Sequence, residues 1–239
     1  MPPGPDLTSK IGTIHPMVKT VTTLGVWSKK LEHEVRRCLD TESSGHDPWH
    51  AMRVRDLAIS IGKVIGADID VVEAAALLHD IGHVSGRDDH SQTGANLAGD
   101  LLFRAGFPAD KIAPVTACIH DHHWLPGRAG DPKAPSLEYQ AFADADRLDA
   151  LGAIGIARVF AFGGAHQRPL WNPDPSGAVG QYGISSIHHF YDKLLRLPGD
   201  MYTGMGRRIA TERVTVMRDF LQTFYREWGG DDLEAAANF

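Results

Sequence analysis

A histidine and an aspartate stand side by side at His79 and Asp80, where an apolar run from Val71 to Leu78 ends. The run has the composition of the last turns of a buried helix, and it predicts Gly82 as the C-terminal cap. Titratable side chains are rarely buried unless they are paired or bind a metal ion. An adjacent His-Asp pair at the inner end of a core helix therefore needs a partner, and a divalent cation is the natural candidate.

Other side chains of ligand type lie before and after this pair. Asp47 and Pro48 have the residue types favoured at the N-cap and first position of a helix, which would place His50 in its first turn. Downstream, Asp146 belongs to a helix-like segment that also contains Asp144 and Asp149. Imidazole and carboxylate ligands together suit Mn, Fe, Co, Ni or Zn better than Ca or Mg. The spacing thus predicts a transition-metal site with open positions for water and substrate.

The order His50, then His79-Asp80, then Asp146 resembles the H…HD…D signature of the HD-domain metal-dependent phosphohydrolases. The flanking segments 50–54, 74–82 and 145–148 resemble the three motifs of that family. Segments 144–158, 162–164, 190–195 and 224–228 are similar to the small stand-alone bacterial HD hydrolases that include manganese-dependent deoxynucleoside triphosphate pyrophosphohydrolases. The resemblance covers roughly residues 45–230.

The resemblance implies a role for individual residues. Four are expected to bind the metal ion, namely His50, His79, Asp80 and Asp146, and Asp80 is also expected to orient the attacking water as a catalytic residue. Lys193 is the best candidate for holding phosphate groups, followed by Arg53 and Arg147. Asp144 and Asp149 are expected to lie behind the ligands, cap a helix or face solvent. Arg168 is expected to be a surface charge on a loop.

A second group of histidines extends the four-ligand pattern. The segments around His83, His90 and His120–His123 resemble parts of the dinuclear HD enzymes. The candidate ligands for a second ion are His90, His122 and His123, and Asp80 would bridge the two ions. The alternative left open is that His120 and His123 face solvent while His90 contacts the substrate. One or two ions are therefore expected.

The pattern of apolar residues has a helical period almost throughout, with no convincing strand. It predicts helices from about Ser91 to Gly106, from Pro108, from Ser136, and from about 149 to 160, and two more over the last fifty residues. Gly and Pro enrichment predicts loops at 124–135 and 163–181. The expected fold is all-α: a single compact HD-domain helical bundle over 23–239, preceded by a flexible lead over 1–22.

The amino-acid composition of the chain limits the kinds of partner that it is expected to bind. The chain has 239 residues and 43% hydrophobic content, and it lacks an apolar run of the roughly 20 residues that cross a membrane. Its two cysteines are too few for a disulfide scaffold, and the start of the chain lacks the features of a signal peptide, so the cytoplasm is expected. The net charge of −6 disfavours binding to a nucleic-acid polymer. A small phosphate compound is the expected partner, and homo-oligomerisation is left open.

These patterns and the resemblance predict metal-dependent hydrolysis of a small nucleotide-like phosphate ester or anhydride. Conversion of a (deoxy)nucleoside triphosphate to monophosphate and pyrophosphate is the most specific form of this prediction. A phosphodiesterase or a phosphomonoesterase would use the same motifs. A di-iron oxygenase of the HD fold and a non-catalytic ligand-binding HD domain are the alternatives, and iron content with oxygen consumption would separate the first from a hydrolase.

Overall fold

The computed structural model describes residues 25–40, 44–82, 90–121, 135–173 and 183–231, with His90 and Ser91 as backbone only. These segments are helical and contain no extended β-strand, so the all-α prediction is confirmed. The α-helices are α1 Val26–Leu39, α2 Pro48–Ile65, α3 Ile69–Leu78, α4 His90–Ala105, α5 Ala109–Asp121, α6 Leu137–Asp149, α7 Gly152–Ala165, α8 Ser186–Asp192 and α9 Gly204–Gly229, and a 3₁₀ helix, η3, spans Leu194–Asp200.

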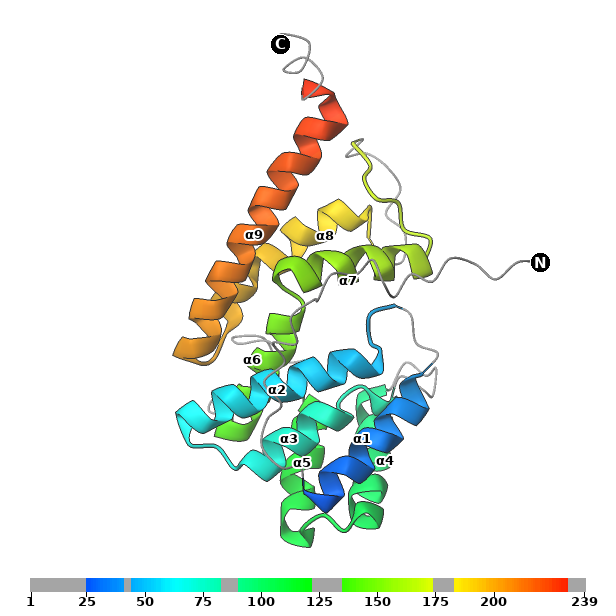
Figure 1. Ribbon diagram of the computed structural model, residues 1–239, viewed down its shortest axis with the longest axis vertical. Helices are drawn as coiled ribbons and strands as arrows, with labels where there is room; N and C mark the ends of the chain where they lie inside the picture. Colours follow the sequence, from blue (N-terminus) through cyan, green and yellow to red (C-terminus); the bar gives the residue numbers. More distant parts are fainter. Residues whose placement is uncertain (1–24, 41–43, 83–89, 122–134, 174–182, 232–239) are drawn as a thin grey trace, which may run out of the picture.

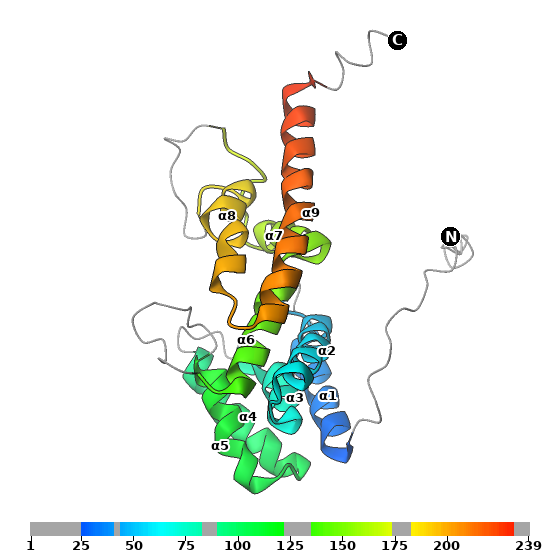
Figure 2. The ribbon, with the colours of Figure 1, turned by 90° about the vertical axis from the view of Figure 1, so that its left-hand side faces the viewer.

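The helices form two groups joined by α6 (Figures 1 and 2). Helices α1 to α5 lie together at one end, and α7, α8 and the long α9 lie at the other. Helix α6 packs against α2 and α3 in the first group and against α9 in the second. Residues from the start of α2, the end of α3 and the middle of α6 can therefore meet near the junction of the two groups.

Helix α2 begins where the sequence predicts. Asp47 is the N-cap, and its carboxylate accepts a hydrogen bond of 2.8 Å from the backbone N–H of His50. Pro48 occupies the first turn, where a missing N–H costs nothing. Gly66 ends the helix in the left-handed conformation, with φ of 78°. This local chemistry fixes His50 in the first turn of the helix, with its side chain directed into the protein.

Helix α3 ends earlier than predicted. The last helical residue is Leu78, His79 is the C-cap with right-handed backbone angles, and Ile81 and Gly82 form a 3₁₀ turn. The prediction that Gly82 caps the helix is wrong, because its φ does not lie in the left-handed region. A Cβ atom added to Gly94 of α4 would lie 3.4 Å from the Cα of Gly82. Gly94 therefore allows α4 to pack closely against the turn that follows His79 and Asp80.

Two other elements differ from the expectation. Helix α1 was not anticipated as a separate element, although its buried Leu31, Val35 and Leu39 join the core. Helix α7 continues to Ala165, so the loop predicted from 163 begins too early. Position 163 of this helix requires a glycine, because a Cβ atom there would lie only 2.3 Å from the Ser186 hydroxyl oxygen. The predicted lead over 1–22 and the loop segments 124–134 and 174–181 lie outside the described residues.

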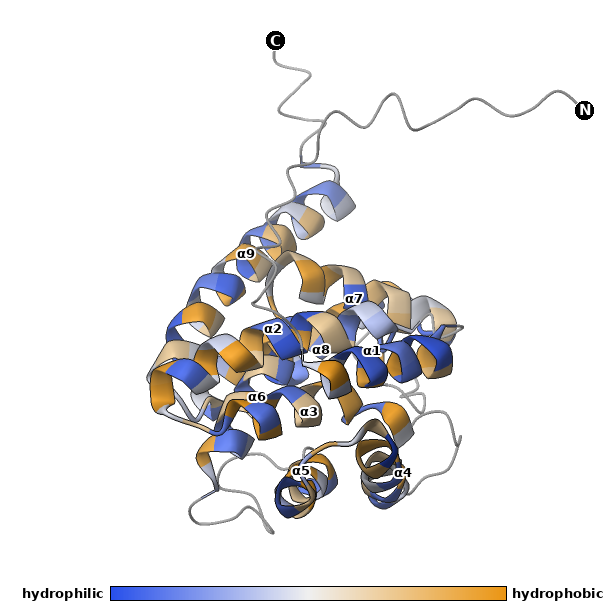
Figure 3. Cartoon of the chain, turned by 60° about the horizontal axis from the view of Figure 1, so that its bottom comes forward, coloured by the Kyte–Doolittle hydropathy of each residue, from blue (hydrophilic) through white to orange (hydrophobic). Residues whose placement is uncertain are grey.

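The core is built from the apolar faces of the central helices. Leu77 and Leu78 of α3 pack with Phe142 and Leu148 of α6, and each is at most 1% exposed. Figure 3 shows hydrophobic and hydrophilic residues sharing each helix, as expected for amphipathic helices around a core. Within the described residues no single helix has the length and hydropathy of a membrane span; α6 and α7 pass that test only as a pair bent by 70°.

Candidate metal centre

The four residues predicted as metal ligands lie together. The Nε2 atoms of His50 and His79 are 3.1 Å apart. The Oδ2 atom of Asp80 lies 3.4 Å from the first and 3.3 Å from the second. The Oδ1 atom of Asp146 lies 3.5 Å and 3.7 Å from the same two nitrogens. Ligand atoms held about 2.1 Å from a cation lie about 3.0 to 3.4 Å from one another at octahedral or tetrahedral angles, so the spacing fits one divalent ion.

The hydrogen bond made by the Nδ1 atom of each imidazole determines whether its Nε2 atom can accept. The Nδ1 atom of His79 is 2.9 Å from the backbone oxygen of Ala76, which can only accept, so His79 carries its proton on Nδ1. The Nδ1 atom of His50 is 2.7 Å from the Asp149 carboxylate, which assigns a proton there as well. In the neutral rings both Nε2 atoms are therefore acceptors, and they face two carboxylate oxygens. Such a cluster of acceptors needs a cation among them.

The pKa values of His50, Asp80 and Asp146 also indicate that this cluster favours a positive charge. Burial acts to lower the pKa of His50, but hydrogen bonds with Asp146, Asp149 and Asp80 outweigh it and raise the pKa to about 10. Burial would raise the pKa of Asp80 and Asp146, yet the neighbouring histidines hold both pKa values well below the ordinary range. Without a metal ion, a proton on His50 would compensate the carboxylates. The donor set of two imidazoles and two carboxylates fits a divalent transition metal equally well.

Asp149 holds His50 from behind and is itself held by two arginines. Its carboxylate accepts hydrogen bonds from Arg53 Nε at 2.7 Å and Arg53 Nη2 at 3.0 Å, and from Arg158 Nη1 at 3.1 Å. Burial would raise the pKa of Asp149, but His50 and Arg53 lower it to about 2. Arg53 was predicted to hold substrate phosphates; in the structure its guanidinium is engaged by Asp149, and this arginine does not line the neighbouring pocket.

His46 was not singled out as a site residue from the sequence. Its Nδ1 atom lies 2.9 Å from Asp80 Oδ2, and its side chain is 31% exposed at the pocket edge. Together with His50 and Asp80 it forms a second group of donors spaced to hold a metal ion. The signal was present in the sequence, because His46 immediately precedes the N-cap Asp47 and must lie close to His50.

The histidines proposed for a second ion remain predictions. His122, His123 and the side chain of His90 lie outside the described residues. His120 is described, is about half exposed, and pairs its Nδ1 with the adjacent Asp121 at 2.6 Å. This position agrees with the expectation that His120 faces away from the site.

A pocket of about 350 Å³ opens beside the four clustered residues. At one end it is lined by His46, Asp80 and Asp146, and Asp146 is 30% exposed there. Its other walls carry cationic or titratable side chains, namely Arg147, Arg158, Arg168, His189 and Lys193, and apolar side chains that include Val159, Phe162, Leu194 and Leu197. The pocket thus combines candidate metal ligands with cationic and apolar side chains.

The predicted phosphate-binding residues differ in their surroundings. Lys193 is exposed and lines the pocket, as expected for a residue that meets a ligand. Arg147 also lines the pocket, but its guanidinium donates to the backbone oxygen of Asp200 at 2.9 Å and lies over the Tyr202 ring. Arg168, expected on the surface, is only 9% exposed and lies over the ring of Phe162. Burial, with Lys193 and Arg168 nearby, lowers the pKa of His189 to about 4.

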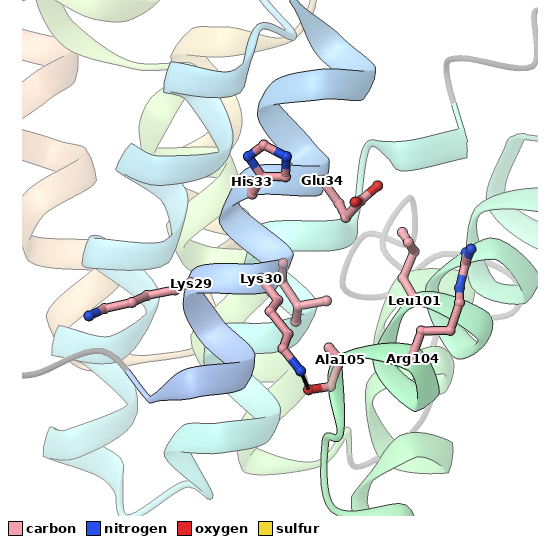
Figure 4. Close-up of a pocket in the computed structure, with 8 residues that line it drawn as sticks. Lys29, Lys30, His33, Glu34, Leu101, Arg104 and Ala105 are labelled. Carbon is pink, nitrogen blue, oxygen red and sulfur yellow. Dashed lines mark hydrogen bonds between the residues drawn. The ribbon is translucent and has the colours of Figure 1, made fainter.

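A second pocket, of about 370 Å³, lies between α1 and α4 and shares no residue with the metal cluster (Figure 4). Two of its charged residues have structural partners. Lys30 donates to the backbone oxygen of Ala105 at the end of α4, and Glu34 pairs with Arg37. Glu34 and Arg104 project from facing helices at its edge. We therefore assign the candidate active site to the pocket that is lined by Asp80 and Asp146.

Several known proteins resemble this chain in sequence and in fold. The HD domain profile matches residues 49–151. YpgQ of Bacillus subtilis is 36% identical over 205 residues, which are 84% of this chain and 94% of YpgQ. The structure of YpgQ in complex with ADP matches with a TM-score of 0.67 and 32% identity over 84% of this chain and 94% of that one. An HD-superfamily hydrolase of Bacillus thuringiensis matches with a TM-score of 0.65 and 34% identity, over 84% and 96%.

A protein of Lactobacillus plantarum has a similar fold, with a TM-score of 0.72 and 30% identity over 87% of this chain and 99% of that one. This chain therefore belongs to the HD superfamily of metal-dependent phosphohydrolases. The predicted family and enzyme class are confirmed.

Proposed function

We propose that the protein hydrolyses a small nucleotide-like phosphate compound with the help of a divalent transition metal ion held by His50, His79, Asp80 and Asp146. The observation that carries the proposal is that two imidazole Nε2 atoms lie 3.1 Å apart and that each lies 3.3–3.7 Å from one oxygen of Asp80 and one of Asp146, beside an open pocket. Mn, Fe, Co, Ni and Zn all suit this donor set. These four residues suit one ion; the candidate ligands for a second ion are His90, His122 and His123, and His46 lies beside Asp80.

The metal ion, when bound, would polarise a phosphoryl oxygen and lower the pKa of a water molecule. The residues of the chain supply the rest. Asp80 is held by His46 on one side and faces the pocket, so its carboxylate can accept a hydrogen bond from water and orient it. Lys193 and Arg168, on other walls of the pocket, can meet the negative charge of a phosphate chain. The apolar side chains near Phe162 suit a flat base.

The specific reaction that we propose is cleavage of a deoxynucleoside or nucleoside triphosphate between the α and β phosphates. Three features support a nucleotide substrate: the resemblance of segments 144–228 to the pyrophosphohydrolase subgroup, the complex of the related YpgQ with ADP, and a pocket lined by cations as well as by the candidate ligands Asp80 and Asp146. The pocket volume of about 350 Å³ is within the range of small-molecule sites.

The test is a substrate panel with purified protein that has been stripped by a chelator and reloaded with Mn, Co or Mg. Nucleoside monophosphate and pyrophosphate, separated by chromatography, are the expected products from triphosphates. Release of nucleoside and inorganic triphosphate would overturn the cleavage site. Turnover of phosphomonoesters or cyclic nucleotides alone would assign a different hydrolase activity, and oxygen consumption by an iron-loaded protein would assign an oxygenase.

A further inference from the structure

The two imidazoles of the metal cluster are held in different ways. His79 is oriented by the backbone oxygen of Ala76, three residues earlier in the same helix, through a bond of 2.9 Å. His50 is oriented by a side chain, Asp149, which comes from α6 and is 2.7 Å away. No side-chain substitution can remove the oxygen that holds His79. The orientation of His50, in contrast, depends on one carboxylate.

That carboxylate has little freedom of its own. Its side chain is 2% exposed, and both of its oxygens accept hydrogen bonds from Arg53, one Nε and one Nη2, in a two-point arrangement. Arg158 of α7 donates to Oδ2, the same oxygen that meets His50. Bidentate arginine–carboxylate pairs have a defined geometry and are stronger than neutral hydrogen bonds. Three helices thus converge on Asp149, because Arg53 lies on α2, Asp149 on α6 and Arg158 on α7.

We propose that Asp149 is a positioning residue that keeps a proton on His50 Nδ1 and directs His50 Nε2 toward the metal, with Arg53 and Arg158 fixing the carboxylate. The proposal rests on the proposed function in so far as the cluster binds a metal. Carboxylates that accept a hydrogen bond from a metal-binding histidine orient the ring and raise its basicity, and their loss commonly costs about 10- to 100-fold in metal affinity. The two arginines offset the negative charge of the buried Asp149 carboxylate. Asp149 can therefore stay hydrogen-bonded to His50 and does not need a metal ion to balance its charge.

The experiment compares wild type with Asp149→Ala and Asp149→Asn, and uses Asp219→Asn, an exposed carboxylate on α9, as the matched control. Zn²⁺ affinity is measured by competition with a chelating dye. In ¹⁵N-histidine-labelled protein, NMR follows the Nδ1–H protons of His50 and His79, with and without Zn²⁺. We expect Asp149→Ala to weaken Zn²⁺ binding by about 10- to 100-fold. The His50 proton should shift strongly while that of His79 stays in place, and Asp149→Asn should be intermediate.

The outcomes separate the possible failures. If Asp149→Ala lowers the melting temperature but leaves Zn²⁺ affinity and the His50 Nδ1–H signal unchanged, Asp149 is structural and the proposal is overturned. If wild type binds no divalent metal, the proposed function fails, while the Nδ1–H signal of the metal-free protein still tests the positioning. Should both Asp149 variants fail to fold, Arg53→Lys replaces them, because it keeps the charge and loses the two-point contact. A smaller loss of Zn²⁺ affinity in Arg53→Lys supports the proposal, and wild-type affinity overturns it.

Discussion

The Nε2 atoms of His50 and His79 face each other at 3.1 Å, with each ring donating its other N–H away from the cluster. Two lone pairs at this distance repel unless a proton or a metal ion lies among the acceptors. The carboxylates of Asp146, Asp149 and Asp80 around His50 favour that positive charge and raise the pKa of His50. The close spacing also makes the cluster sensitive to the loss of any single donor, which leads to the first prediction.

Substitution of His79 or Asp80 by alanine should remove the metal and with it the activity. Each variant deletes one of the four donors, and activity should fall by at least about a thousandfold because the metal supplies both electrophile and activated water. Metal content by mass spectrometry and turnover of the best substrate are the measurements. Circular dichroism should show that the helices remain. A variant that retains both bound metal and near-wild-type turnover would disprove the assignment of these ligands.

Metal binding should release a proton at neutral pH. In the metal-free protein the pKa of His50 is about 10, so its ring carries an extra proton that a metal ion must displace from Nε2. Metal affinity should therefore increase by up to about tenfold per pH unit between pH 6 and 9. Calorimetry in buffers of different ionisation enthalpy counts the protons released. The absence of proton release, together with pH-independent affinity, would contradict the protonated state of His50.

Lys193 should contribute to substrate binding. Lys193→Met removes a cation that lines the pocket, and we expect the KM for a nucleotide to rise about tenfold or more with a smaller effect on kcat. Arg196→Met is the matched control, since Arg196 is also exposed, lies three residues further on, and does not line the pocket. Steady-state kinetics on both variants decides it. If the KM rises equally in the two variants, Lys193 acts only through the general charge of the surface and not as a ligand of the substrate.

His189 should make stability depend on pH. Its pKa is about 4 in the folded protein and 6.5 ordinarily, so between these values the unfolded state binds more protons than the folded state. Stability should therefore decrease as the pH falls from about 6.5 to 4, by at most about 1.4 kcal/mol per pH unit from this group. Urea unfolding of wild type and His189→Gln at several pH values measures it. The variant should lose this part of the slope; an identical slope would refute the prediction.

A second metal ion, if it binds, should depend on His122 more than on His120. His120 pairs with Asp121 at the surface, so His120→Ala should leave the metal content unchanged. His122→Ala should reduce it from about two ions to one per chain, and the two ions should lie about 3.5–4 Å apart with Asp80 bridging them. A stoichiometry of one in both wild type and His122→Ala would remove the support for a second centre.

The sequence could place the candidate ligands because His50 and His79-Asp80 are marked by local signals, while the resemblance of segment 145–148 to the family motif singled out Asp146 from Asp144 and Asp149. His50 follows an N-cap and a proline, and His79-Asp80 ends an apolar helix, so the position of each in its helix could be read from its neighbours. The role of Asp149 could not be read in this way. Its partners Arg53 and Arg158 lie on α2 and α7, and only the packing of these helices against α6 brings the three residues together.

The misplaced residues have similar physical causes. Arg168 belongs to a Gly- and Pro-rich segment typical of surface loops, yet Gln167 adopts a positive φ of 55° and Arg168 N–H bonds to the Gly163 oxygen at 2.8 Å. This turn directs the chain back and buries Arg168 in the pocket wall. Gly82 has the residue type of a helix cap, but α3 already ends at Leu78, and the turn that contains Gly82 packs against Gly94 of α4. In both cases the surrounding structure overrides a local preference.

The three aspartates of α6 have three separate tasks. Asp144, fully buried, accepts hydrogen bonds from the backbone N–H groups of Tyr202 and Thr203 and from the Thr203 hydroxyl, and so secures the start of α9. Asp146 faces the pocket, and Asp149 holds His50. Because a residue in an α-helix turns by about 100° from the previous one, these side chains leave the helix axis in different directions. Rotation of α6 about its axis would therefore loosen all three attachments at once. Because Asp144 holds Thr203 at the start of α9, the attachment of α9 is linked to the helix that carries Asp146 and Asp149.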